Sequence, residues 1–498
     1  MGRVSYAVRT AVLRGVEACP VIVEVSTSQG IPGVTIVGMA DTAVQEARSR
    51  VRCAFRECGY KFPREHFTVN LAPSELKKTG TGFDLPIAVA ILACTGQIPV
   101  RNLDKCLFVG ELALTGQVCP VRGMVAFDLL AAQQGLTLVG PVGSTSIEGG
   151  QTRLIRSLAQ LKQGTSSLEL CPSGMCDLDD SSFEESELDF SEVIDQEMAK
   201  RACVIAASGD HGLLMVGPPG SGKSMIAKRI PTILAPLSSE EKAEAMLVYS
   251  AAGQDLGDIQ RGRRPFRAPH HAITKGGLVG GGRPVRPGEI SLAHHGVLFL
   301  DEMPEFGPSV LQALRQPMED HEVRLVRVDG TYAFPCDFML VGAANPCPCG
   351  YLGDPDHECS CSPARIHSYQ SRIGGPLMDR IDVLVDVARP ASSRIIAGKR
   401  GTSSKSMSEQ VETARAYSSW RLARAHHGSD RECNVRELGL DDAACATLDG
   451  YAQRLGLGGR NIVRIARVAR TIADLDNSES VSKDHVMEAC AYRTRTSL

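Results

Sequence analysis

A glycine-rich loop between an apolar segment and a helix-like segment constrains this chain more than any other feature. The loop reads GPPGSGKS from Gly217 to Ser224 and fits the pattern G-x-x-x-x-G-K-[ST]. It follows GLLMV, which is typical of a buried strand, and precedes SMIAKRI, which is typical of a helix. Backbone N–H groups of such a loop surround phosphates, and the helix start adds positive potential. The pattern therefore predicts a nucleotide-binding α/β domain.

The residues of this loop have separate expected roles. Lys223 is expected to reach the β- and γ-phosphates, and Ser224 to hold Mg²⁺. The remaining residues of the phosphate cradle are Gly217, Pro218, Pro219, Gly220, Ser221 and Gly222.

Two later apolar segments also end in polar residues. VLFL precedes Asp301 and Glu302, and FMLVGAA precedes Asn345. Carboxylates at the end of a buried strand are costly unless they bind a metal or position water. We therefore expect Asp301 to contact Mg²⁺ and Glu302 to polarise the attacking water. Asn-Pro alone is only a turn signal, but beside a phosphate loop Asn345 is expected to orient that water, so the set predicts nucleotide hydrolysis.

Composition limits the possible partners and the compartment. The chain has 54 Lys and Arg against 57 Asp and Glu, so any nucleic-acid contact must be a local patch. It has 17 cysteines, no visible signal peptide and no apolar run of membrane-spanning length. We therefore expect a cytoplasmic protein with reduced thiols and no membrane contact.

Changes in composition along the chain predict an α/β architecture in several parts. Residues 1–165 alternate strand-like and helical stretches, and residues 196–395 form a second α/β region. Between them, residues 166–195 are acidic and lack Lys and Arg, which is typical of a solvated linker, although an acidic docking tail has the same composition. Residues 396–498 are predominantly helical.

Four cysteines form two close pairs separated by turn residues. They are Cys347, Cys349, Cys359 and Cys361. Two thiolate pairs brought together make a tetrahedral S₄ site that suits structural Zn²⁺, although C-x-C is tighter than the usual zinc-finger spacing. His357 is an alternative ligand. The adjacent His270 and His271 are expected to point apart and to pack or hydrogen-bond rather than bind a metal.

These motifs occur within longer blocks that resemble the magnesium-chelatase-like AAA+ ATPases of the YifB/ComM family. The blocks include RPFRAPHHAITKGGLVGGG, RPGEISLAHHGVLFLDEMPEF, NPCPCGYLGDP and RVARTIADL. The resemblance implies a P-loop AAA+ core, a C-terminal helical lid, ATP with Mg²⁺, and a homo-oligomeric ring, a hexamer. Lys223 and Ser224 then match Walker A, Asp301 and Glu302 match Walker B, and Asn345 matches sensor 1.

The same resemblance gives roles to two arginines. Arg380 matches the arginine finger that acts on a neighbouring subunit's nucleotide, although spacing alone also allows a local salt bridge to Asp379 or Asp382. Arg460 matches the sensor-2 arginine. The sequence departs from the family there, because two glycines replace a serine/alanine pair before Arg460 and loosen the helix start.

The N-terminal region resembles the Lon-protease-like (ribosomal S5-like) domain of the same family. Lon-type hydrolysis needs a serine nucleophile activated by a lysine. Gly82 stands at the position of the serine, and Val125 at the position of the lysine. Thr79 and Thr81 are alternative nucleophiles, but the sequence shows no base for them. We therefore expect a domain without the catalytic dyad, and no protease activity.

Two segments are candidates for the surface on which the ring acts. The basic, glycine-rich stretch 261–286 suits either a pore loop or a packed structural insertion. Residues 322–332 predict a β-hairpin with a turn at Asp329-Gly330. In the MCM helicases, which belong to the same AAA+ clade, a hairpin at this place faces the channel. Arg324 and Arg327 would then contact DNA phosphates, whereas the alternative is that they are solvated charges.

The resemblance favours a DNA motor. It implies helicase or branch-migration activity on branched or single-stranded DNA, in recombination or natural transformation. The alternative is a chaperone-like protein remodeller related to the ATPase subunit of magnesium chelatase.

Overall fold

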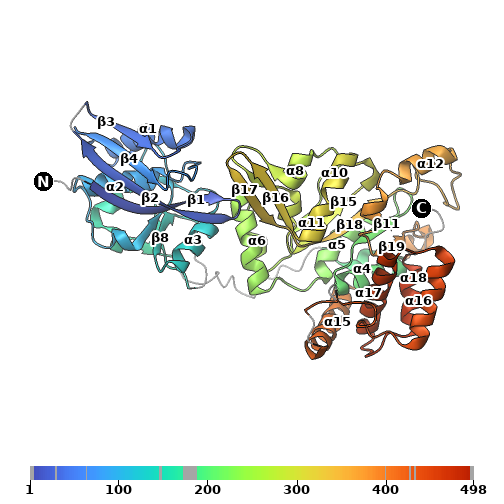
Figure 1. Cartoon of the computed structure of the whole chain (residues 1–498). Coiled ribbons are helices and arrows are strands. Elements are labelled where there is room, and N and C mark those ends of the chain that lie inside the picture. The colour runs from blue at the N-terminus through green and yellow to red at the C-terminus, as the bar shows by residue number, and fades with distance from the viewer. Residues whose placement is uncertain are drawn as a thin grey trace.

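The computed structural model describes residues 5–28, 31–62, 64–144, 149–171, 188–398, 400–425, 428–430 and 433–493. Two α/β parts follow one another along an elongated molecule (Figure 1). The first is the N-terminal part, and the second is the middle part of the chain. A group of C-terminal helices packs below the middle part in this view. Within the described ranges, the cysteines are free thiols and no helix is long and apolar enough to cross a membrane.

The N-terminal part is built on an eight-stranded sheet in the order β10-β9-β8-β5-β1-β2-β4-β3. Its strands are β1 Ser5–Arg14, β2 Glu17–Ser28, β3 Gly33–Val37, β4 His66–Ala72, β5 Cys106–Phe108, β8 Thr137–Pro141, β9 Thr152–Ile155 and β10 Glu169–Leu170, with a small separate ribbon of β6 Glu111–Leu112 and β7 Val118–Cys119. Its helices are α1 Thr42–Glu57, α2 Asp84–Cys94 and α3 Met124–Gln133. Helix α2 is buried at every position, because β1 and β2 contact it together with α1.

The middle part is built on a five-stranded parallel sheet in the order β12-β15-β18-β11-β19. Its strands are β11 Leu213–Val216, β12 Phe266–Arg267, β15 Gly296–Leu300, β18 Phe338–Ala344 and β19 Val383–Asp386. Every residue of β11 and β15 is buried, which explains why both read as continuous apolar runs. The strands are parallel, so the residues that follow β11, β15 and β18 meet at one edge. The mixed α/β class predicted from the sequence is confirmed.

Helices surround this sheet, and two small ribbons accompany it. The helices are α4 Glu197–Gly209, α5 Lys223–Arg229, α6 Ser239–Ala252, α7 Gly257–Gln260, α8 Lys275–Val279, α9 Glu289–Leu292, α10 Pro308–Ala313, α11 Arg315–Asp320, α12 Pro363–Gln370, α13 Gly375–Met378 and α14 Ser392–Ile396. The ribbons pair β13 Gly280–Gly281 with β14 Arg286–Pro287, and β16 Glu322–Arg327 with β17 Gly330–Pro335.

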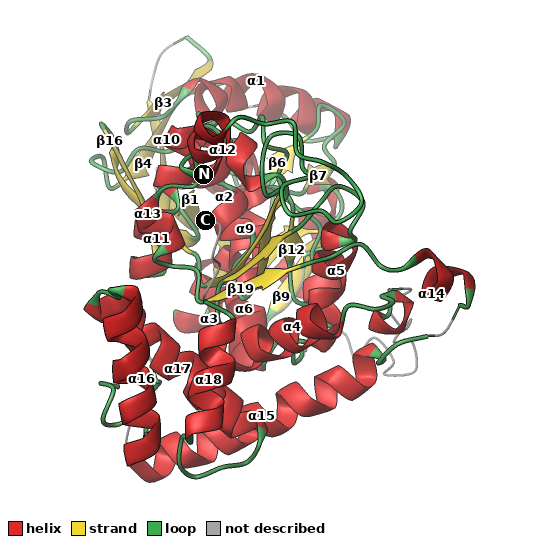
Figure 2. Cartoon of the chain, turned by 90° about the vertical axis from the view of Figure 1, so that its right-hand side faces the viewer, coloured by secondary structure: helices red, strands yellow, loops and turns green. Residues whose placement is uncertain are grey.

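The C-terminal helices gather on one side of the middle part (Figure 2). They are α15 Ser404–Ala425, α16 Asp442–Leu455, α17 Gly459–Leu475 and α18 Lys483–Ala491. Helices α15 and α17 both pack on α4, and buried residues such as Ile205, Val411 and Ile465 belong to one continuous apolar cluster. The helical group therefore shares a core with the parallel sheet.

The predicted solvated linker at 166–195 is folded at both of its described ends. Residues 172–187 lie outside the described ranges. Before them, Leu168 is buried in the apolar core of the N-terminal part. After them, Phe190 and Val193 are fully buried in the cluster that contains α4. The acidic composition gave no sign of these buried apolar residues. The expectation of a solvated linker is therefore wrong for the two ends of the segment.

The predicted hairpin is confirmed and lies against the N-terminal part (Figure 1). Arg327 pairs with Gly330, so the two-residue turn is one position earlier than the predicted Asp329-Gly330. Lys77 Nζ of the N-terminal part lies 3.8 Å from Asp329 Oδ2, and the Arg14 guanidinium lies 5.7 Å from the centre of the Tyr332 ring. The hairpin is therefore a contact between the two α/β parts.

Candidate nucleotide-binding site

The glycine-rich loop connects the end of β11 to the start of α5. Gly220 and Gly222 have φ of +78° and +92°, a left-handed backbone that glycine adopts without strain. Helix α5 begins at Lys223. The unpaired N–H groups of its first turn therefore point toward the loop, which is the arrangement that binds phosphate.

Lys223 is folded back into this loop. Its Nζ donates hydrogen bonds to the carbonyl oxygens of Gly217 at 2.8 Å and Pro218 at 3.0 Å. Burial lowers the pKa of the Lys223 ammonium to about 8, although the charges of Asp301 and Glu302 oppose this shift. The ammonium group is held by neutral carbonyls, so it can turn toward a phosphate without breaking an ion pair.

Residues at the ends of β15 and β18 converge on the same loop. Ser224 Oγ donates to Asp301 Oδ2 at 2.6 Å, and the backbone N–H of Glu302 donates to Asp301 Oδ1 at 3.0 Å. Lys223 Nζ also donates to Asn345 Oδ1 at 3.3 Å. A hydroxyl and a carboxylate are hard oxygen donors, so Ser224 and Asp301 fit a Mg²⁺ ion bound with a nucleotide. The structure thus brings together the residues predicted for Walker A, Walker B and sensor 1.

Glu302 has a partner that the sequence did not reveal. It has φ of +50°, and its side chain is 55% exposed, with Oε2 at 3.5 Å from His271 Nδ1. The His270 and His271 rings lie side by side with centroids 4.1 Å apart, so they do not point apart as predicted. The predicted packing and hydrogen bonding are confirmed, because the His271 ring lies against Phe306 and His270 Nδ1 accepts the backbone N–H of Ala272 at 3.2 Å. The two adjacent histidines were the sequence signal available for this contact. No local pattern indicates that the basic, glycine-rich stretch 261–286 folds over the end of β15.

Arg380 lies at the end of the sheet where the parallel strands begin, whereas the phosphate loop lies at the end where they finish. It precedes β19, whose residue Val383 pairs with Leu213 at the start of β11. At about 3.3 Å per residue, the length of β11 separates this edge from the loop by about 10 Å. The Arg380 guanidinium donates a hydrogen bond to Glu319 on α11, a partner that the sequence analysis did not consider.

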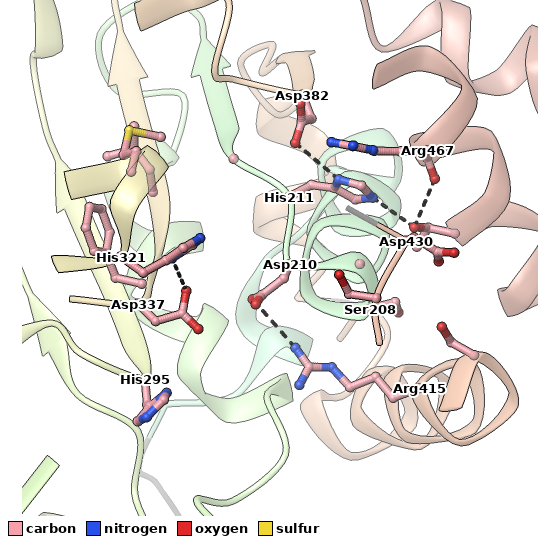
Figure 3. Close-up of a pocket in the computed structure, with 18 of the residues that line it drawn as sticks. Ser208, Asp210, His211, His295, His321, Asp337, Asp382, Arg415, Asp430 and Arg467 are labelled. Carbon is pink, nitrogen blue, oxygen red and sulfur yellow. Dashed lines mark hydrogen bonds and ion pairs between the residues drawn. The ribbon is translucent and has the colours of Figure 1, made fainter. Parts of the chain in front are cut away.

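Arg380 lines a cleft of about 1060 Å³ between the parallel sheet and the C-terminal helices (Figure 3). Buried His211 connects the two walls of this cleft. Its Nδ1 lies 3.2 Å from Asp382 Oδ2, and its Nε2 lies 2.8 Å from Thr471 Oγ1 on α17. Arg415 on α15 lies 3.8 Å from Asp210 Oδ1. Polar contacts therefore join the C-terminal helices to the strand starts of the sheet.

The cleft also holds a cluster of Glu244, His294 and His295. Glu244 Oε2 lies 3.1 Å from His294 Nε2 and 2.8 Å from His295 Nε2. His294 Nδ1 accepts the backbone N–H of Asp337 at 3.0 Å, and burial lowers the pKa of His294 to about 4. A neutral His294 ring that accepts at Nδ1 carries its proton on Nε2 and donates it to Glu244. The three side chains therefore form a hydrogen-bonded contact.

Arg460 is exposed on the first turn of α17. The next residue, Asn461, accepts a hydrogen bond from Arg493 at 2.6 Å, and Arg493 also donates to the carbonyl of Ile381. Ile381 directly follows Arg380, so the start of α17 lies at the Arg380 edge of the sheet. The structure does not bring Arg460 to the phosphate loop of its own chain.

The four cysteines of the two C-x-C pairs form one cluster. Their Sγ atoms all lie within 4.8 Å of one another. Cys347 Sγ is 3.3 Å from Cys349 Sγ and 3.7 Å from Cys359 Sγ. A tetrahedral ZnS₄ site with bonds of about 2.3 Å has sulfur atoms about 3.8 Å apart, whereas a disulfide needs about 2.0 Å. The cluster therefore fits a tetrahedral metal and not a disulfide. His357 contacts Arg389 and Asp354 and is not part of it.

The basic side chains of the hairpin and the insertion have mixed surroundings. Arg324 is 66% exposed and donates to Glu322 Oε2 at 2.7 Å, and Arg327 lies against Gly281 of the insertion. Arg264 and Arg267 of the insertion bind the carboxylates of Glu241 and Glu289. The packed interpretation therefore holds for Arg264 and Arg267.

In the N-terminal part, the two positions compared with the Lon dyad lie in apolar surroundings. A Cβ placed on Gly82 would lie 3.5 Å from Val109, and Val125 is buried. The Thr81 hydroxyl donates to Glu111 Oε2, a carboxylate partner that the sequence analysis missed.

Three family models match successive parts of the chain. The model described as "Subunit ChlI of Mg-chelatase" matches residues 23–142. The model described as "Magnesium chelatase, subunit ChlI" matches residues 189–395, and "Magnesium chelatase, subunit ChlI C-terminal" matches residues 401–493.

Several curated proteins are similar along almost their whole length. "Uncharacterized protein YifB" of Escherichia coli is 38% identical over 498 residues, which cover 98% of this chain and 96% of that protein. "Competence protein ComM" of Haemophilus influenzae is 38% identical over 494 residues, which cover 97% and 96%. "Magnesium-chelatase 67 kDa subunit" of Chlorobaculum parvum is 25% identical over 159 residues, which cover 32% of this chain and 23% of that protein.

Proposed function

The chain belongs to the magnesium-chelatase-like YifB/ComM family, and from this premise we propose that it is an ATP-hydrolysing AAA+ ring motor acting on DNA. One observation carries the ATPase assignment. Where three parallel strands end, Lys223 Nζ donates to Asn345 Oδ1 at 3.3 Å, and the adjacent Ser224 Oγ donates to Asp301 Oδ2 at 2.6 Å.

Each residue of this group has a task in hydrolysis. Lys223 binds the β- and γ-phosphates, and Ser224 and Asp301 hold Mg²⁺ with the nucleotide. Bound Mg²⁺ supplies charge stabilisation on the phosphate oxygens. Glu302 orients the attacking water and accepts its proton, and Asn345 positions the water beside the γ-phosphate.

We propose that the active form is a homo-oligomeric ring, a hexamer. Arg380 and Arg460 lie near the strand starts, away from the phosphate loop of their own chain. In the proposed ring, head-to-tail contacts place this surface against the nucleotide of the next subunit. Arg380 then acts as the arginine finger, and Arg460 is a second arginine on the same edge.

We propose that the substrate is branched or single-stranded DNA, moved by helicase or branch-migration activity during recombination or natural transformation. A whole-length relative is named as a competence protein, which supports a role connected with DNA. The exposed hairpin side chains of Arg324 and Arg327 supply positive charge for phosphate contacts.

The remaining parts have supporting roles in this proposal. Residues 1–165 form a Lon-protease-like domain without its catalytic dyad, and residues 396–498 form the helical lid. The acidic segment 166–195 joins the first domain to the ATPase core. The free thiols suit a reducing compartment, in keeping with a cytoplasmic protein.

ATP turnover measured with and without DNA tests the proposal. Forked or four-way DNA is expected to accelerate phosphate release. Changing Arg324 and Arg327 together to Ala is expected to reduce this stimulation. The slope of log DNA affinity against log salt concentration is expected to fall by about 1.5 for each subunit that contacts DNA, because each such subunit loses two phosphate contacts. The matched Lys/Lys variant keeps the charge and is expected to retain most of the stimulation. If DNA leaves the rate of ATP turnover unchanged at every salt concentration, the proposal of a DNA motor is contradicted and a protein remodeller is favoured.

We further propose that Cys347, Cys349, Cys359 and Cys361 hold a structural Zn²⁺ ion. Metal analysis of the reduced protein is expected to find about one zinc per chain, because four thiolates complete one tetrahedral site. Cys349→Ser is expected to lose the metal. Cys445→Ser, which changes an exposed cysteine on α16, is the control and retains it. A zinc-free protein with paired disulfides at these positions contradicts the assignment.

A further inference from the structure

The cysteine loop, residues 347–361, is in direct contact with the phosphate loop. Gly350 has φ of +86°, and a Cβ placed there would lie 2.6 Å from Cδ of Pro219. Only glycine allows the cysteine loop to come this close to the Pro219 ring. The position of Pro219 therefore depends on where the cysteine loop is held.

Arg389, just after β19, joins the two loops by several contacts. Its Nε donates to the carbonyl of Pro219 at 3.3 Å, and its Nη1 donates to His357 Nδ1 at 3.1 Å. Its guanidinium lies 5.5 Å from the centre of the Tyr351 ring and 3.8 Å from Asp354 Oδ2. One cation is thus shared between the phosphate loop and three residues of the cysteine loop.

The cysteine loop buries little apolar surface of its own. Cys347 is fully buried, whereas residues 353–361 are exposed or only partly buried. Ordering a backbone costs about 1–2 kcal/mol per residue, which a loop with little buried apolar surface cannot recover through the hydrophobic effect. A metal that joins Cys347 and Cys349 to Cys359 and Cys361 closes the loop and supplies the missing stabilisation.

We propose that zinc occupancy of the cysteine cluster controls nucleotide binding, with Arg389 as the connecting residue. When the metal is bound, the ordered loop presents Tyr351, Asp354 and His357 to Arg389, and Arg389 holds the Pro219 carbonyl in the position required by the phosphate loop. When the metal is lost, Arg389 loses these partners and the phosphate loop loses its support. Arg389 is a positioning residue. The inference rests on the proposed ATP-binding function.

Equilibrium binding of a fluorescent ATP analogue to the full chain, without DNA, tests the coupling. Removal of zinc with a chelator under reducing conditions is expected to weaken nucleotide binding about tenfold, a typical allosteric coupling, and added Zn²⁺ is expected to restore it. The wild-type chain serves for this comparison, so no variant has to fold. Nucleotide affinity that is the same with and without bound zinc overturns the proposal.

The variant Arg389→Met identifies the connecting residue. It is expected to retain one zinc per chain, to bind nucleotide as weakly as the zinc-free wild type, and to show no further loss when zinc is removed. Arg394→Met, at a largely exposed arginine on α14 that pairs with Asp195, is the control and keeps the zinc dependence. Zinc dependence that persists in Arg389→Met overturns the role of Arg389. If the zinc-loaded wild-type chain binds no nucleotide, the proposed ATP-binding function itself is wrong. That result differs from nucleotide binding that is unaffected by zinc, which contradicts only the coupling.

Discussion

Replacing Glu302 by Gln is expected to abolish steady-state ATP hydrolysis while leaving ATP binding intact. The amide has the size of the carboxylate but cannot accept a proton from water, and loss of a general base typically costs about 10²–10⁴-fold in rate. The substitution spares Lys223, Ser224 and Asp301, the residues that we propose contact the phosphates and Mg²⁺. Phosphate release measures the loss of turnover, and fluorescent nucleotide binding measures the retained affinity.

The matched control is Glu305→Gln. Glu305 is also a partly exposed carboxylate after β15, but it pairs with Arg372 at 3.2 Å. This variant is expected to hydrolyse ATP at close to the wild-type rate. Turnover of Glu302→Gln within tenfold of wild type would show that the base lies elsewhere. A loss of nucleotide affinity in the same variant would mean that Glu302 acts in binding.

The candidate nucleotide site was predictable because each of its parts is local in sequence. The loop from Gly217 to Ser224 identifies itself by its spacing, and the apolar runs before Asp301 and Asn345 read as buried strands. Parallel strands bring their carboxyl ends to one edge, so the proximity of Lys223 and Asn345 followed from the fold class.

Contacts between distant segments were not predictable in the same way. His271 belongs to the basic insertion and contacts Glu302 only because the insertion folds back over β15. Phe190 stands in an acidic stretch, but it packs into the core beside α4. Side-chain type and spacing carry no information about such partners, because long-range packing decides them.

Strand β1 shows the same limit in secondary structure. It pairs with β2 along its full length, from Ser5 with Ser26 to Arg14 with Glu17. The two-residue turn between these strands is Gly15-Val16, which is not the Asn-Gly or Asp-Gly pair that most strongly marks a tight hairpin. The burial of β1 also does not alternate regularly. Its partner strand, rather than its own pattern, makes it a strand.

Arg380→Ala is expected to reduce ATP hydrolysis by about 10³-fold, because an arginine finger stabilises the charge that develops on the transferred phosphoryl group. Nucleotide affinity is expected to change little, since Arg380 lies at the strand starts, away from the phosphate loop. Arg372→Ala, which removes an exposed arginine paired with Glu305, is the control and is expected to retain turnover.

Mixing the two inactive variants distinguishes action on a neighbour from action within one chain. In a mixed ring, an interface is complete when an Arg380→Ala subunit supplies the nucleotide site and a Glu302→Gln subunit supplies the arginine. Random assembly from equal amounts makes about a quarter of the interfaces complete, so about a quarter of wild-type turnover is expected if the interfaces act independently. An arginine that acts within its own chain leaves every site defective, because each subunit then lacks one of the two groups. A mixture that co-assembles and remains as inactive as its components therefore contradicts the arginine-finger role of Arg380.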